Sequence, residues 1–139
     1  MKGGFASRQV RFDPTPEIFA TESDGSFDFL LTVDGEEWLE TEGYDEMRLV
    51  LSVWHPTPKR TIDLDRAYLE LQGRFDRREE HWTRVAEIEP IVPAYGTGTS
   101  FDGWVVLPVF GAHSSLRLSG AGIDGRARLQ IRSHAHFVS

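Results

Sequence analysis

Two histidines near the end of the chain, His134 and His136, are separated by a single residue. In an extended strand alternate side chains share a face, so the two imidazoles would lie roughly 7 Å apart. Such a pair can supply two ligands to Zn, Fe or Mn, with another histidine or a carboxylate completing the site. No third ligand follows at a fixed spacing. Two surface histidines are the simpler interpretation, and a metal-dependent small β-barrel enzyme using this pair is an alternative.

Arginines share that face of the same segment. Arg126, Arg128 and Arg132 alternate with apolar residues, so a strand over residues 126–138 would carry a local basic stripe. Acids on a neighbouring strand are the expected partners, because opposite charges commonly pair across strands. The whole chain has 15 Lys and Arg against 22 Asp and Glu, a net charge of −7. Nucleic acid is therefore not an expected partner, since phosphate binding requires a basic surface.

Tryptophans are the other candidate residues for recognition of a ligand or partner. Trp38 lies in an acidic segment and Trp54 precedes His55-Pro56, so these two are the candidates for exposure. Exposed tryptophans can stack on sugars or anchor a protein partner. Trp104 begins a nearly continuous apolar run and is expected in the core. The candidate ligand-binding residues are Trp38, Trp54, Arg128, Arg132, His134 and His136.

Motifs for other chemistry are missing. The acidic residues between positions 34 and 46 do not have the EF-hand order, so a solvated acidic loop is simpler than a Ca²⁺ site. Gly-x-Ser-x-Gly, P-loop and Rossmann patterns are absent, and so is cysteine. We therefore expect no catalytic residue and no cofactor, and the balance is against an enzyme.

The apolar pattern that must position these residues has a period of two. It predicts strands over residues 26–33, 47–54, 66–75, 104–110, 116–118 and 126–138. Asp34-Gly35 between the first two strands predicts a tight turn with positive φ. In the second strand, Val50 and Trp54 lie opposite the apolar face, which suggests a central strand covered on both sides.

The sequence also gives expectations for four further parts of the chain. Residues 5–12, in the N-terminal segment 1–25, are predicted to form either an edge strand or an N-terminal arm. The prolines after His55 predict an irregular loop. Residues 76–88 fit a hairpin better than the alternative of one short helix. The last three strands, from Trp104 to Val138, are expected to form a meander of neighbours.

Short strands about 10 residues apart, separated by Gly, Pro and Asp-Gly, predict an all-β fold. We expect one domain over residues 1–139, an antiparallel β-sandwich. Its general look is similar to jelly-roll and galactose-binding-like modules, an analogy of architecture only. The first residues lack a signal sequence and no stretch is long and apolar enough for a membrane span, so we expect a cytoplasmic protein without membrane contact.

The expected function is non-catalytic binding of a protein or of a small-molecule or carbohydrate ligand, through a sheet face or the end loops. An alternative is a structural subunit that forms a homo-oligomer, because unpaired sheet edges can join copies.

Overall fold

The computed structural model describes residues 7–14, 19–20, 26–54, 62–64, 66–90, 97–98, 100–109, 111–122 and 128–139. Every regular element in these ranges is a β-strand, so none of them holds a helix able to cross a membrane. The strands are β1 (Ser7–Arg11), β2 (Phe19–Ala20), β3 (Phe27–Leu31), β4 (Trp38–Glu40), β5 (Glu46–Trp54), β6 (Ile62–Asp63), β7 (Tyr68–Arg74), β8 (Thr83–Glu87), β9 (Glu89–Pro90), β10 (Thr97–Gly98), β11 (Ser100–Pro108), β12 (His113–Ala121) and β13 (Arg128–Val138).

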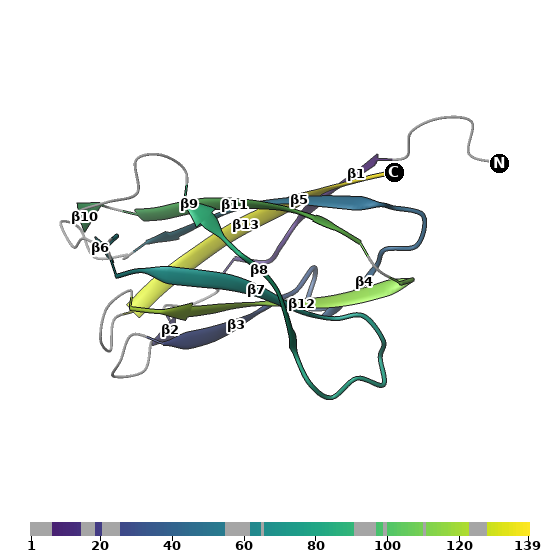
Figure 1. Cartoon of the computed structure of the whole chain (residues 1–139), viewed down its shortest axis with the longest axis horizontal. Helices are drawn as coiled ribbons and strands as arrows, with labels where there is room; N and C mark the ends of the chain where they lie inside the picture. The colour runs from purple at the N-terminus through teal and green to yellow at the C-terminus, as the bar shows by residue number, and fades with distance from the viewer. Residues whose placement is uncertain are drawn as a thin grey trace.

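Two antiparallel sheets lie one above the other (Figure 1). The upper sheet in Figure 1, which we call the front sheet, has the order β1-β13-β5-β11-β9, and β2 also pairs with β13. The lower sheet, which we call the back sheet, has the order β3-β12-β7-β8, and β4 also pairs with β12. A short β6–β10 pair lies outside both.

The path of the chain is that of a jelly roll. The chain passes from β1 in the front sheet to β3 and β4 in the back sheet, and then returns to β5 in the front sheet. It crosses to β7 and β8 in the back sheet, and β11, β12 and β13 then lie in the front, back and front sheets in turn. Alternation between two sheets of this kind is the double Greek key of jelly rolls. The expected all-β antiparallel sandwich of jelly-roll architecture is confirmed.

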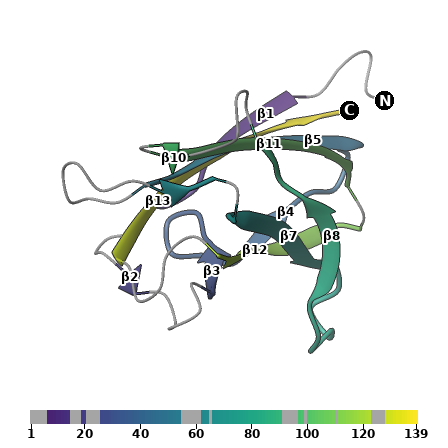
Figure 2. The same cartoon turned by 60° about the vertical axis from the view of Figure 1, so that its left-hand side comes forward.

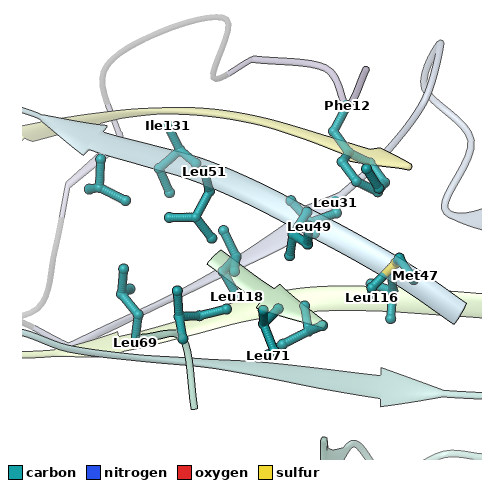
Figure 3. Close-up of a cluster of buried hydrophobic side chains, with 14 of the residues drawn as sticks. Phe12, Leu31, Met47, Leu49, Leu51, Leu69, Leu71, Leu116, Leu118 and Ile131 are labelled. Atoms are coloured by element: carbon teal, nitrogen blue, oxygen red, sulfur yellow. The ribbon is translucent and has the colours of Figure 1, made fainter. Parts of the chain in front are cut away.

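The core fills the space between the sheets (Figure 3). On β5 the inward residues Met47, Leu49, Leu51 and Val53 are buried, as the two-residue period predicts. They face the back sheet, whose buried residues include Leu69, Leu71, Leu116 and Leu118. Each buried leucine stabilises the fold by roughly 1.5–3 kcal/mol relative to exposure, so this layer holds the two sheets together.

The predicted turn at Asp34-Gly35 is confirmed. Asp34 and Gly35 have φ of 51° and 80°, and Val33 and Glu36 exchange backbone hydrogen bonds of 2.9 Å. Positive φ at both central residues matches a type I′ turn, which Asp-Gly favours.

Residues 76–88 form a hairpin in which β7 pairs with β8, so the short helix is not formed. The connection between the two strands extends away from both layers (Figure 2). A register shift lies between Leu71 and Gln72 of β7. Of the two interpretations of residues 5–12, the structure has the edge strand, since β1 lies at the margin of the front sheet beside β13.

The expected meander from Trp104 to Val138 is wrong. β11 and β13 both pair with β5 in the front sheet, and β12 lies in the back sheet. Short turn signals show where a strand ends, but they do not show whether the next strand pairs with it or crosses to the opposite layer.

β5 is central as expected, because it lies between β13 and β11. Its outer side is not covered as expected, since Val50 keeps 36% of its surface exposed. The predicted irregular loop after His55 lies outside the described residues.

Candidate functional site

The outer surface of the front sheet, here called the front face, carries an exposed apolar patch. Val50 on β5 is the direct cross-strand partner of Trp104 on β11, and Val106 is two residues further along β11. Their exposed fractions are 36%, 45% and 44%. Three adjacent apolar side chains on central strands, all facing solvent, are typical of a surface that another molecule covers.

Polar side chains lie beside this patch on β13 and β1. His134 is paired with Val50 on one side and with Arg11 on the other. His136 lies between Arg48 and Gln9 in the same way. The β13 side of the front face is therefore basic or neutral, and these cross-strand neighbours bring no carboxylate to the two imidazoles.

The next positions along the three strands form a polar row of Arg132, Ser52 and Asp102, in which Ser52 is the cross-strand partner of both other residues. Asp102 accepts a hydrogen bond from the Ser52 hydroxyl and another of 2.7 Å from the Ser100 hydroxyl. The Arg132 guanidinium lies 5.5 Å from the centroid of the Trp54 ring. This row places a cation on β13 and an anion on β11, with a small hydroxyl between them.

Four of the six predicted binding residues meet on the front face: Trp54, Arg132, His134 and His136. Arg128 belongs to β13 by its backbone, and its side chain lies outside the described part, as does Arg126. Arg132 contacts Trp54 and not an acid on the neighbouring strand, which differs from the expected ion pair.

Trp38 does not join them. It lies in β4 and not in a loop, and it pairs with Ser115 on the outer side of the back sheet. The strand forms there because Trp38, Leu39 and Glu40 alternate half-buried, buried and exposed against β12. Trp38 and Trp54 are thus on opposite faces of the sandwich and cannot contact one compact ligand.

The back sheet carries an alternating stack that we call the arginine–tryptophan ladder, formed by Arg77, Trp38, Arg74, Trp82 and Arg117. The Arg74 guanidinium lies 5.3 Å from the Trp38 ring centroid and 4.3 Å from that of Trp82. The Arg117 guanidinium lies 4.7 Å from the Trp82 ring centroid, and that of Arg77 lies 5.7 Å from the Trp38 ring centroid. Guanidinium groups over aromatic rings are attracted by the negative ring face.

The ladder is embedded in hydrogen bonds to the same sheet. Arg74 donates to Glu37 at 2.9 Å, and Ser115 donates to the same oxygen at 3.2 Å. Arg117 donates to Gln72 at 2.6 Å, and Gln72 in turn donates to Glu70 at 2.6 Å. These contacts join the polar groups of the back face to one another, which is typical of a structural network, although the buried Arg74 Nε has no hydrogen-bond partner among the described residues.

Glu70 also accepts a hydrogen bond of 2.9 Å from the Tyr68 hydroxyl. Burial, followed by this hydrogen bond and the charge of Glu70, raises the pKa of Tyr68. The raised pKa favours the protonated form of Tyr68, which is the form that donates this hydrogen bond.

The serines beside His113 have structural partners. Ser114 and Ser115 are buried, and Ser114 shares a hydrogen bond of 3.2 Å with the Thr41 hydroxyl. A nucleophile must be reachable by substrate, and these hydroxyls are not. Within the described ranges, no three His, Cys, Asp or Glu side chains are placed to hold one metal ion.

Trp104 is the residue that the sequence interpretation missed. It was expected in the core, but Phe101, Gly103, Val105 and Leu107 are the buried residues of β11, and Trp104 points outward. The signal was present, because Ser100 and Asp102 have the same parity as Trp104 and are polar. Their alternation fixes which side of the strand faces water.

No family model and no curated protein matches this sequence. Among solved structures, the chain is similar to a chain in the structure of infectious bursal disease virus strain Gx. The two share 10% identity with a TM-score of 0.52, and the match covers 99% of this chain and 32% of the viral chain. It is also similar to the SPBc2 prophage-derived protein YomS, with 10% identity, a TM-score of 0.47 and coverage of 100% and 98%.

A third similar structure is the CBM22-2 xylan-binding domain of Paenibacillus barcinonensis Xyn10C, with 10% identity, a TM-score of 0.41 and coverage of 100% and 94%. At such low identity a likeness concerns the fold alone, and unrelated functions share this architecture. The arguments about function therefore rest on the chemistry of the two sheet faces.

Proposed function

We propose that this chain is a non-catalytic binding domain that recognises a protein partner through its front face. The observation that carries the proposal is the apolar patch of Val50, Trp104 and Val106, exposed on the central strands. The back face offers no equivalent, because its tryptophans and arginines are engaged with each other.

The composition of the front face favours protein over carbohydrate. Protein interfaces combine an apolar centre with tryptophan and arginine, the types most often found as binding hot spots. Val50 and Val106 add apolar area but no polar group for a sugar hydroxyl. Arg132 already occupies one face of the Trp54 ring, which leaves less of it for stacking on a sugar.

Site-specific photo-crosslinking tests this proposal. A benzoylphenylalanine placed at Val106, expressed in the cells that produce the chain, should give a discrete protein adduct, whereas the same probe at Leu30 should not. Leu30 is a matched control because it is 37% exposed on the outer side of the back sheet.

The second arm of the experiment keeps the probe at Val106 and adds one lysine. Val50→Lys should reduce the adduct at least about fivefold, because burying an unpaired ammonium in an interface is costly. Leu30→Lys should leave it unchanged. Equal adducts from both probe positions, or an adduct insensitive to Val50→Lys, would contradict the proposal.

A further inference from the structure

The front face is complementary to itself. Its strand order places the cation Arg132 on β13 and the anion Asp102 on β11, at equal steps on either side of β5. With the other residues that the structure describes, neither of the two forms an ion pair. Both are exposed and hence available to a partner.

A two-fold axis parallel to β5 converts this arrangement into contacts. Such an axis keeps β5 over β5 of a second copy and exchanges β13 with β11, as in any isologous interface. Arg132 of each copy then faces Asp102 of the other, and His134 faces Trp104. Val50 lies on the axis against its own counterpart, so the apolar patch becomes the centre of the contact.

We propose that the partner recognised by the front face is a second copy of this chain, joined by two reciprocal Arg132–Asp102 ion pairs around Val50. The inference rests on the proposed function, and it names the partner of that same surface.

Sheet geometry is compatible with these contacts. Sheets stacked face to face lie about 10 Å apart, with their strands within roughly 30° of each other. Arg132 and Asp102 lie in the row next to Val50, only about 7 Å along the strands, where such a crossing separates the copies little.

Charge complementarity favours a second copy over other proteins. A uniformly acidic partner would match Arg132 but meet Asp102 with like charge, and a basic partner would do the reverse. Only a surface with the two charges in opposite order matches both, and a two-fold copy supplies it. Arg48, also on β5, is neutralised by Glu46 of its own strand at 2.9 Å.

Two of the outer strands, β1 in the front sheet and β8 in the back sheet, are poor alternatives for joining copies. β1 is five residues long and carries Arg8 and Arg11, and β8 is equally short and carries Arg84 and Glu87. Short, charged edge strands are a common way to prevent pairing between chains. Association through the face is therefore favoured over association through these two strands.

Charge reversal tests the pairing by sedimentation equilibrium of the purified full chain. Arg132→Asp places two carboxylates opposite each other at both ends of the contact, and Asp102→Arg does the same with guanidiniums. Each single variant should raise the dimer dissociation constant at least about tenfold, because like charges across an interface are costly. The double variant should return it to within about threefold of the wild type.

The sharpest arm mixes the two single variants. Carboxylates at both positions of one chain then meet guanidiniums at both positions of the other, so the mixture should form a heterodimer more tightly than either variant forms its own dimer. Thermal unfolding shows whether each variant folds. Where a charge-reversed variant does not fold, the neutral substitution at the same position, Arg132→Gln or Asp102→Asn, is measured in its place. Leu30→Lys should dimerise like the wild type.

A wild type that stays monomeric up to about 1 mM would overturn the inference, and so would a mixture or double variant without recovery. The proposed function would survive either result if the Val106 probe still captured a different protein. It would fail together with the inference if that probe captured nothing, or captured proteins no differently from the Leu30 probe.

Discussion

Asp13 connects two segments that are distant in the sequence. Its carboxylate accepts hydrogen bonds from the backbone N–H groups of Asp34 and Gly35 at 3.0 and 2.9 Å, and from the Thr32 hydroxyl at 2.7 Å. Its own N–H donates to the Thr32 carbonyl at 2.7 Å. One side chain thus fixes the turn that follows β3 to the end of β1.

These contacts give a pH-dependent prediction. The hydrogen bond from Gly35, followed by that from Thr32, lowers the pKa of Asp13 from its ordinary 3.8. Because the folded pKa is depressed, the stabilisation is present above the unfolded pKa and is lost as the pH falls through the folded value. Asp13→Asn should cost about 1 kcal/mol of unfolding free energy near neutral pH.

Urea unfolding of both proteins, at about pH 7 and at steps below about pH 4, measures the effect. The difference between wild type and Asp13→Asn should shrink as the wild-type carboxylate becomes protonated. A difference that is constant over this range would show that the carboxylate charge is not what holds the turn.

Gly120 is required by packing. It lies on the inner side of β12, and a Cβ there would overlap the ring of Phe27 and approach Leu69 within 2.9 Å. Gly120→Ala should therefore destabilise the fold by about 1–3 kcal/mol, since a close-packed core relaxes only at a cost.

Thermal and urea unfolding measure this change, and Gly35→Ala separates the cause. No atom lies within 4 Å of the Cβ position at Gly35, whose φ is positive, so the cost there comes from the backbone alone. A second substitution, Phe27→Leu, should recover part of the stability lost in Gly120→Ala but none of that lost in Gly35→Ala. Equal recovery in both would contradict the packing explanation.

At the scale of elements, the arginine–tryptophan ladder joins β4, β7, β12 and the hairpin segment before β8. The Trp82 ring contacts two guanidiniums of this ladder, those of Arg74 and Arg117. Trp82→Ala should lower the unfolding free energy by roughly 1–3 kcal/mol, through two cation–π contacts and lost apolar burial.

Trp104→Ala is the matched control, because the same ring is removed from an exposed position of the front face. Its stability cost should be no more than about 1 kcal/mol in urea unfolding, as for most surface substitutions. Equal losses in the two variants would mean that the ladder does not stabilise the hairpin.

The alternation of apolar and polar residues was sufficient to predict most strands. In β3, β5, β7 and β13 the buried residues alternate with more exposed ones, as the two-residue period predicts, because one polar and one apolar face fix the register. β11 was harder, since Trp104, Val105, Val106 and Leu107 are apolar on both sides. Its outward face could be identified only from Ser100 and Asp102 at its start.

For the whole molecule, the jelly-roll path decides which residues can act together. Because β11 and β13 lie on either side of β5, Asp102 and Arg132 share one face although 30 positions separate them in the sequence. Strand patterns give no information on which strands cross between the two sheets. For this reason the sequence placed Trp38 and Trp54 in one set of candidate binding residues and could not predict which residues share the front face. Four of its predicted residues nevertheless lie there.

Hydroxyl-radical footprinting of the four tryptophans measures directly which face becomes covered. Oxidation of the full chain is compared between a dilute purified sample and an extract of the cells that produce it. Trp104 should be oxidised strongly in the dilute sample and be protected in the extract, while Trp38 and Trp82 stay equally reactive in both. The assignment of binding to the front face would be contradicted if Trp104 were as reactive in the extract as in the dilute sample and Trp38 were protected instead.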